Sequence, residues 1–222
     1  MTKPIIFLGP SLSHKKAKQI LDADYRFPAK KGDLLNLLTL TSTEKIQIGL
    51  VDAVFLQDYP PTPIEVYQLV ARSNQFQVFG ASSLGALRAV ELEKYGMIGI
   101  GKIFDFYKRN IIDADDEIAV TFDQYQNNLI SEALIDIRYN LFLAYKHGII
   151  NKEVKRNMIK IAKKIYFPYR TYDNIINKTL EKYPSCFEQI NLFRSFIIHN
   201  RRSLKERDAI ELLRYLKTSI QK

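Results

Sequence analysis

The sequence predicts an α/β protein with a parallel-sheet N-terminal core followed by an all-helical C-terminal region. Up to about residue 120, short apolar runs alternate with helical patterns, and from about residue 123 the apolar residues recur at helical spacing. Strands separated by helices indicate right-handed βαβ crossovers and hence a parallel sheet. We therefore expect an α/β core domain over residues 1–120 and a basic helical region over residues 121–222.

Three strands and their connecting helices are expected in the core. They are a strand at residues 4–8, a helix from Ser13 to Leu21, a strand at 46–55, a helix from Thr62 or Pro63 to Arg72, and a strand at 76–81 followed by another helix. The carboxyl ends of parallel strands share one edge of the sheet. Residues 9–12, 55–60 and 81–83 are therefore expected to converge there.

The rest of the chain is expected to be helical. The predicted helices run from Ile130 to Gly148, from Asn151 to just before Pro168, over residues 172–183 and 185–198, and from Ser203 through Leu216. Asn151 is expected to cap the second of them. Ser203 and Glu206 have the spacing of a capping box at the start of the last one.

The segment GASSLGALRAVEL at residues 80–92 is the most informative candidate site. Its small residues let the chain turn sharply into a helix, whose first N–H groups attract an anion or a developing oxyanion. Ser83 is the middle residue of Ala81–Gly85, one residue type away from the G-x-S-x-G nucleophile elbow. The alternative is that Ser82 or Ser83 is only the N-cap of the helix.

Arg88 lies on the same helix, which is otherwise too apolar for a surface element. Glu91 follows it at i+3 spacing, so an internal ion pair between the two side chains is one expectation. The other is that Arg88 binds a carboxylate of the substrate.

Composition excludes several classes of protein. No apolar run approaches the roughly 18 residues of a membrane span, and the N-terminus lacks a signal-peptide pattern. The single cysteine, Cys186, excludes a disulfide framework and fits a cytoplasmic location. Lys and Arg number 33 against 24 Asp and Glu, and the excess lies entirely after residue 119. This basic half can face nucleic acid, an acidic carrier protein or an acidic enzyme, or be only a solvated surface.

Neither a cofactor nor a metal ion is expected. Gly96, Gly99 and Gly101 follow a helix rather than a strand and lack the spacing of a dinucleotide fingerprint, so they predict a turn that returns the chain to the core. The acidic residues at 113–117 lack a full calcium-binding loop, and helix capping explains them with fewer assumptions.

Several motifs occur in a fixed order in the first half of the chain. They are Gly9-Pro10-Ser11-Leu12, Pro28-Ala29-Lys30-Lys31-Gly32-Asp33, the strand Ile48 to Phe55 containing Asp52, Glu65, the segment 80–92, Tyr95 to Gly101, and Asp115-Asp116-Glu117-Ile118-Ala119. In this order they resemble the TfuA-like family, the partner proteins of YcaO enzymes in peptide-backbone thioamidation. The resemblance covers roughly residues 3–120.

The chain departs from the family pattern just before Glu65. Many members carry a tryptophan–histidine pair there, whereas this chain reads Pro60-Pro61-Thr62-Pro63-Ile64 and contains no tryptophan. A histidine general base for the serine turn has to come from elsewhere. His14, His147 and His199 are all poorly placed in the sequence for that role.

The resemblance implies an accessory protein that works with a YcaO-type ATP-dependent enzyme, a ubiquitin-like sulfur carrier and a peptide or protein substrate. It implies release or delivery of sulfur by hydrolysis of the carrier's thiocarboxylate, with Ser83 as nucleophile, Asp52 or Asp33 as base or positioning group, and Arg88 orienting the carrier tail. The expected substrate-binding residues are Gly9, Pro10, Ser11, Asp33, Ser82, Gly85 and Glu91. The alternative is a non-catalytic adaptor that docks the carrier and the enzyme together and acts by proximity.

Overall fold

A computed structural model describes residues 2–54, 58–123 and 128–220. The described chain divides into two compact units, one formed by residues 1–115 and 205–222 and the other by residues 116–204. This division differs from the expected boundary at residue 120, because the last helix returns to the first unit. Its apolar side is buried there, as described below.

The first unit contains, within the described residues, a parallel sheet of five strands in the order β2-β1-β3-β4-β5. The strands are β1 (Ile5–Phe7), β2 (Asp24–Arg26), β3 (Ile46–Leu50), β4 (Phe76–Ala81) and β5 (Ile98–Ile100). The predicted α/β fold with a parallel sheet is confirmed. The short edge strands β2 and β5 were not predicted, because β2 has no apolar run and β5 contains Gly99 in a segment that was expected to be a turn.

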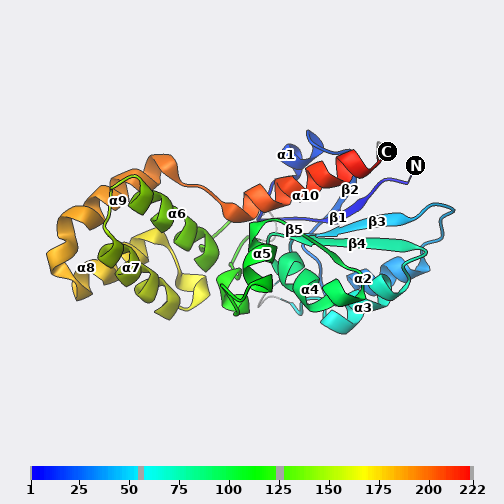
Figure 1. Ribbon diagram of the computed structural model, residues 1–222, viewed down its shortest axis with the longest axis horizontal. Helices are drawn as coiled ribbons and strands as arrows, with labels where there is room; N and C mark the ends of the chain where they lie inside the picture. The colour runs from blue at the N-terminus through cyan, green and yellow to red at the C-terminus, as the bar shows by residue number, and fades with distance from the viewer. Residues whose placement is uncertain (1, 55–57, 124–127, 221–222) are drawn as a thin grey trace. The chain divides into compact units, whose positions relative to one another are not determined.

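Helices cover both faces of this sheet (Figure 1). On one side lie α1 (His14–Lys18) and α10 (Leu204–Ile220), and on the other lie α2 (Asp33–Asn36), α3 (Pro63–Ala71) and α4 (Leu84–Leu92), while α5 (Lys102–Lys108) follows β5. Leu212 and Leu216 of α10 are fully buried in a cluster with Ile6 of β1 and Phe79 of β4. Each such leucine contributes roughly 2 kcal/mol of hydrophobic stabilisation, which accounts for the return of α10 to the sheet.

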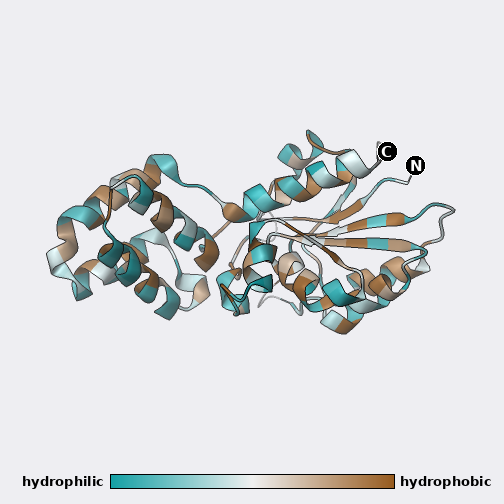
Figure 2. Cartoon of the chain, in the orientation of Figure 1, coloured by the Kyte–Doolittle hydropathy of each residue, from teal (hydrophilic) through white to brown (hydrophobic). Residues whose placement is uncertain are grey.

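The second unit is helical, and Figure 2 shows the apolar residues of its helices alternating with hydrophilic ones. Its helices are α6 (Leu134–Lys146), α7 (Lys152–Lys164), α8 (Tyr172–Lys182) and α9 (Phe187–Asn200). Asn151 caps α7 as predicted, because its side chain accepts a 2.9 Å hydrogen bond from Val154 N. α6 begins later than predicted, since the N–H groups of Ile130 and Ser131 donate to the carbonyl of Thr121 instead. Among the described helices, none is long and apolar enough to cross a membrane.

Candidate functional site

Three polar side chains meet where β1, β3 and β4 end. Asp52, two residues after β3, is buried and accepts three hydrogen bonds: Gly9 N (2.9 Å) and Ser11 N (3.0 Å) donate to Oδ2, and Ser11 Oγ donates to Oδ1 over 2.6 Å. Ser82, directly after β4, donates from its Oγ to Ser11 Oγ over 3.0 Å. A line of hydrogen bonds therefore runs from Ser82 through Ser11 to the carboxylate.

This arrangement confirms the predicted convergence for the ends of β1 and β4. The third segment expected at this edge was residues 55–60, of which 55–57 lie outside the described residues. The residue after β3 that contacts the other two segments is Asp52. In a sheet of order 2-1-3-4-5 the direction of winding reverses between β1 and β3, and such a reversal is where α/β proteins bind ligands. The main chain is tied together at the same point, because Val51 N and Asp52 N both donate to the carbonyl of Phe7 and Ala29 N donates to that of Asp52.

Ser82 has an unusual backbone conformation. Its φ is +67°, a left-handed value that costs a residue with a side chain roughly 1 kcal/mol or more. Gly80 and Gly85 flank this turn because α4 lies against the sheet there: an added Cβ at Gly80 would overlap the carbonyl oxygen of Gly85, and one at Gly85 would overlap that of Leu50. A strained serine between a strand and a close-packed helix is the geometry of a nucleophile elbow.

The strained residue is thus one position before the predicted Ser83. Ser83 occupies the N-cap position of α4, as the alternative interpretation expected, but within the described residues its side chain makes no capping hydrogen bond. The sequence contains a signal for Ser82, because Gly80-Ala81-Ser82 matches the first half of G-x-S-x-G. The second glycine, Gly85, is displaced by one residue.

The predicted ion pair between Arg88 and Glu91 is confirmed. Arg88 Nη1 donates to both carboxylate oxygens of Glu91 (3.0 and 2.8 Å), and its Nε donates to the carbonyl of Pro61 over 3.2 Å. The guanidinium is nearly buried. The structure therefore gives Arg88 an internal partner, and its predicted contact with a substrate carboxylate stays a prediction.

Asp33 is the first residue of α2 and belongs to a separate group of contacts around the loop after β2. Its carboxylate accepts a 2.8 Å hydrogen bond from Lys30 N, and within the described residues no hydrogen bond joins it to Asp52 or to the serines. The buried carboxylate of Glu65 accepts from Gly32 N (2.8 Å) and Leu34 N (3.1 Å) and so attaches this loop to the start of α3. Glu65 therefore links two of the sequence motifs as a structural residue.

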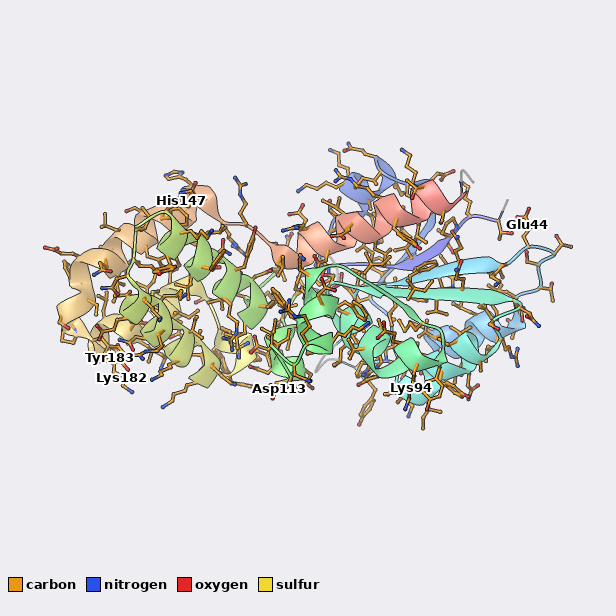
Figure 3. The ribbon with its side chains drawn as sticks, viewed as in Figure 1. Glu44, Lys94, Asp113, His147, Lys182 and Tyr183 are labelled. Atoms are coloured by element: carbon orange, nitrogen blue, oxygen red, sulfur yellow. The ribbon has the colours of Figure 1, made fainter. Side chains whose placement is uncertain are left out.

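No histidine is hydrogen-bonded to the serine turn within the described residues. His14 lies in α1, and its Nε2–H donates to the carbonyl of Leu8 over 2.8 Å. His147 follows α6 in the helical unit, where its ring contacts Phe196 (Figure 3). Asp52 is therefore the acceptor that the fold supplies to the serine hydroxyls.

Asp208 is a further buried carboxylate, and sequence reasoning missed it. It projects from α10 to the end of β5, where its Oδ2 accepts a 2.7 Å hydrogen bond from Ile103 N at the start of α5. Its Oδ1 is buried without a partner in the described chain. Burial raises the pKa of Asp208 to about 6. Nothing local signals this role, since the residue lies in what was expected to be a basic helical tail.

Two of the acidic residues at 113–117 form ion pairs inside the helical unit. Asp116 accepts from Nη2 of the buried Arg170 (2.8 Å to each oxygen), and Glu117 pairs with Arg138. Tyr172 is half-buried against the core of the unit, and its hydroxyl accepts a hydrogen bond from Asn140. Among the described residues, no group of three or more His, Cys, Asp or Glu side chains is arranged to hold a metal ion.

Comparison with known proteins places these residues in a family. A search of curated proteins gave no match. The family model described as TfuA-like protein matches residues 52–171, which begin at Asp52, include the whole serine turn and extend beyond residue 120 into the helical unit. Residues 3–51, where the resemblance was also expected, precede the match. Since the match covers more than half of the 222 residues, the chain belongs to the TfuA-like family.

Proposed function

We propose that this protein is an accessory protein of peptide-backbone thioamidation that acts with a YcaO-type enzyme and hydrolyses the thiocarboxylate of a ubiquitin-like sulfur carrier. Its membership in the TfuA-like family, which is associated with thioamidation, supports the pathway. The observation that supports hydrolysis is the line of hydrogen bonds from the strained Ser82 through Ser11 to Asp52.

We assign the nucleophile to Ser82 rather than to the predicted Ser83. The hydroxyl of Ser82 donates along the line toward Asp52, so a proton that leaves Ser82 has an acceptor. Ser83 and Leu84 follow it at the start of α4, where N–H groups lack intrahelical acceptors and can donate to an oxyanion. Ser83 therefore contributes its backbone N–H in this proposal.

The proposed reaction has two steps. In the first, Ser82 Oγ bonds to the thiocarboxylate carbon and its proton passes through Ser11 to Asp52; the carbon–sulfur bond then breaks as that proton moves from Asp52 to the departing sulfur, which leaves as hydrosulfide and takes up its second proton when the ester is hydrolysed. In the second, water attacks the resulting ester and restores the Ser82 hydroxyl. The net change is thiocarboxylate plus water to carboxylate plus hydrogen sulfide, without an oxidant or reductant.

The burial of the serine turn favours the adaptor as the second candidate function. Ser82 is 0% exposed and Asp52 1%, so an acyl group reaches Ser82 only if the loop at Gly9–Leu12 moves. In a non-catalytic adaptor the same hydrogen bonds would simply join three loops at the sheet edge. Proximity of carrier and enzyme would then account for the faster sulfur transfer.

Release of sulfide from purified components separates the two functions. The protein is incubated with a thiocarboxylated carrier, with no YcaO enzyme present, and sulfide is measured for the parent, Ser82→Ala and Ser83→Ala. For the hydrolase we expect the Ser82→Ala rate to fall by about a hundredfold or more and the Ser83→Ala rate to stay within a few-fold of the parent.

Three outcomes count against parts of this proposal. Loss of sulfide release in Ser83→Ala but not in Ser82→Ala would return the nucleophile to Ser83. Equal rates in all three proteins would remove both serines from the chemistry. No release from the parent would exclude the hydrolase and leave the adaptor, which is then tested by thioamide formation when the YcaO enzyme is added.

A further inference from the structure

One face of α7 carries a row of cations. Within its 13 residues, Lys152–Lys164, the helix has six Lys or Arg side chains and one acid, Glu153. Five of these cations are exposed: Lys152, Arg156, Lys160, Lys163 and Lys164. We call these five the α7 basic stripe. Successive members are separated mostly by three or four residues, so they follow one side of the helix for roughly 17 Å.

The stripe is not neutralised by the protein itself. Among the described residues, no acidic side chain pairs with any of its five cations, although the same unit pairs Arg138, Arg170 and Arg201 with Glu117, Asp116 and Glu132. Like charges one turn apart destabilise a helix by roughly 0.2–0.5 kcal/mol per pair. The stripe therefore lowers the stability of α7, and an anionic partner would remove that repulsion.

Two exposed tyrosines adjoin the C-terminal end of the stripe. Tyr166 is 56% and Tyr169 is 69% exposed, and both lie within five residues of Lys164 at the end of the stripe. Tyrosine is enriched in protein–protein interfaces because its ring is large and apolar and its hydroxyl can be hydrogen-bonded. Cations beside aromatic side chains fit an interface in which charge steers the approach and the rings hold the contact.

We propose that the α7 basic stripe, with Tyr166 and Tyr169, is the docking surface for an acidic face of the sulfur carrier. This assignment rests on the proposed function for the identity of the partner. Exposed lysines contribute little affinity but raise association rates strongly. That combination suits a small carrier, which binds and leaves in every turnover, better than an enzyme held in a lasting complex.

The geometry of the aromatic residues argues against nucleic acid as the occupant. The rings of Tyr166 and Tyr169 are 6.3 Å apart and inclined by 60°, so they do not form a parallel platform on which successive bases stack. Of the cation and the aromatic residue that follow, Arg170 is buried and hydrogen-bonded to Asp116, and Tyr172 is half-buried against the core of the unit. Binding of a nucleic acid to the stripe is one of the results that the test below distinguishes.

The test compares two charge-reversed variants that change the net charge equally. The stripe variant is Lys152→Glu, Arg156→Glu, Lys160→Glu and Lys163→Glu. The control variant reverses four exposed lysines outside the helical unit, Lys15→Glu, Lys18→Glu, Lys45→Glu and Lys217→Glu, which have no ion-pair partner among the described residues. Circular dichroism and thermal unfolding first establish that both variants are folded.

Association and dissociation rates of the purified carrier are then measured for the full-length proteins at low and high salt. At about 50 mM NaCl we expect the stripe variant to associate about tenfold or more slowly than the parent, and the control variant to stay within about threefold. At about 500 mM NaCl the three rates should converge. The double variant Tyr166→Ser, Tyr169→Ser should instead speed dissociation several-fold.

Equal association of the stripe variant and the parent, or an equal loss in the control variant, would overturn the proposal. A labelled single-stranded oligonucleotide that binds the parent and not the stripe variant, while carrier binding is unchanged, would assign the stripe to nucleic acid. These results are independent of the sulfide assay. If Ser82 proves inactive but the stripe variant still loses the carrier, hydrolysis fails and the docking surface stands.

Discussion

Two carboxylates, Asp52 and Asp208, are buried at the same edge of the sheet, and they differ in the hydrogen-bond donors around them. Asp52 accepts hydrogen bonds on both oxygens from the loop after β1, whereas Asp208 accepts at Oδ2 and leaves Oδ1 without a partner in the described chain. Burial of a carboxylate is unfavourable unless donors replace its water. The loop at Gly9–Ser11 therefore supplies donors that stabilise the Asp52 carboxylate, whereas the ionised form of Asp208 stays unfavourable.

The largest expected effect comes from the close packing of α4 against the end of β3, next to Asp52. Gly85→Ala places a Cβ against the carbonyl oxygen of Leu50, and because the obstacle is backbone it cannot rotate away. We expect a loss of about 3–5 kcal/mol of unfolding free energy, or failure to fold, measured by urea denaturation. Gly148→Ala is the matched control, since its φ of +69° costs about 1 kcal/mol and nothing lies within 4 Å of the added atom. Similar losses in both variants would contradict the close-packing argument.

The same isosteric change at the two carboxylates should have different consequences. Asp52→Asn replaces one accepting oxygen by an NH₂ group that faces donors from Gly9 or Ser11. It should therefore remove at least one charge-assisted hydrogen bond and lower the unfolding free energy at neutral pH by about 2–3 kcal/mol. Unfolding in urea at constant pH measures this loss. A variant as stable as the parent would show that the three hydrogen bonds to Asp52 are dispensable.

At Asp208 the expected effect is a change in pH dependence. The folded-state pKa, about 6, is raised above the ordinary value of 3.8, so the folded protein disfavours the ionised form. Stability linked to Asp208 is therefore fully present below about pH 4 and is lost as the pH rises through about 6, by up to about 3 kcal/mol. Asp208→Asn should lack this loss.

The measurement is the slope of unfolding free energy against pH between about pH 4 and 7 in the parent and in Asp208→Asn. Glu132 is present in both proteins, and its pKa, raised to about 7 chiefly by burial, adds the same downward slope to each. The informative quantity is thus the difference between the two curves. Parallel curves would show that Asp208 does not titrate with folding in this range.

The smallest expected effect concerns the conformation of Ser82. Ser82→Ala removes the hydrogen bond to Ser11 and keeps the strained φ, so it should cost about 1 kcal/mol. Ser82→Gly loses the same hydrogen bond but relieves the strain, and its stability should lie between that of Ser82→Ala and that of the parent. Thermal unfolding compares the three proteins. If Ser82→Gly is the least stable of them, the turn is not strained.

Much of the fold could be predicted from the sequence because local patterns encode it. The apolar runs that became β1, β3 and β4 and the cap at Asn151 are short-range features, and the structure contains each of them. β2 was missed, because a half-exposed edge strand needs no apolar run. The helix start expected at Ile130 was wrong, since pairing with Thr121 depends on a residue outside the helical pattern.

The candidate site could be predicted only in part. The strand ends that meet and the Arg88–Glu91 ion pair follow from parallel-strand topology and helical spacing, and both are confirmed. The choice between Ser82 and Ser83 could not be made from residue types, because it depends on which of two adjacent serines takes the positive φ. The roles of Asp33 and Glu65 depend on how the loop after β2 folds back onto α3.

By itself the sequence determined that this is an α/β protein of the TfuA-like family with a serine-containing turn after a buried strand, because periodicity, small residues and motif order are local properties of the chain. The tertiary structure alone decided that Ser82 donates toward Asp52 and that α10 returns to place Asp208 beside β5. These contacts join residues 71 and 105 positions apart, and only the packing of the sheet and its helices brings such residues together.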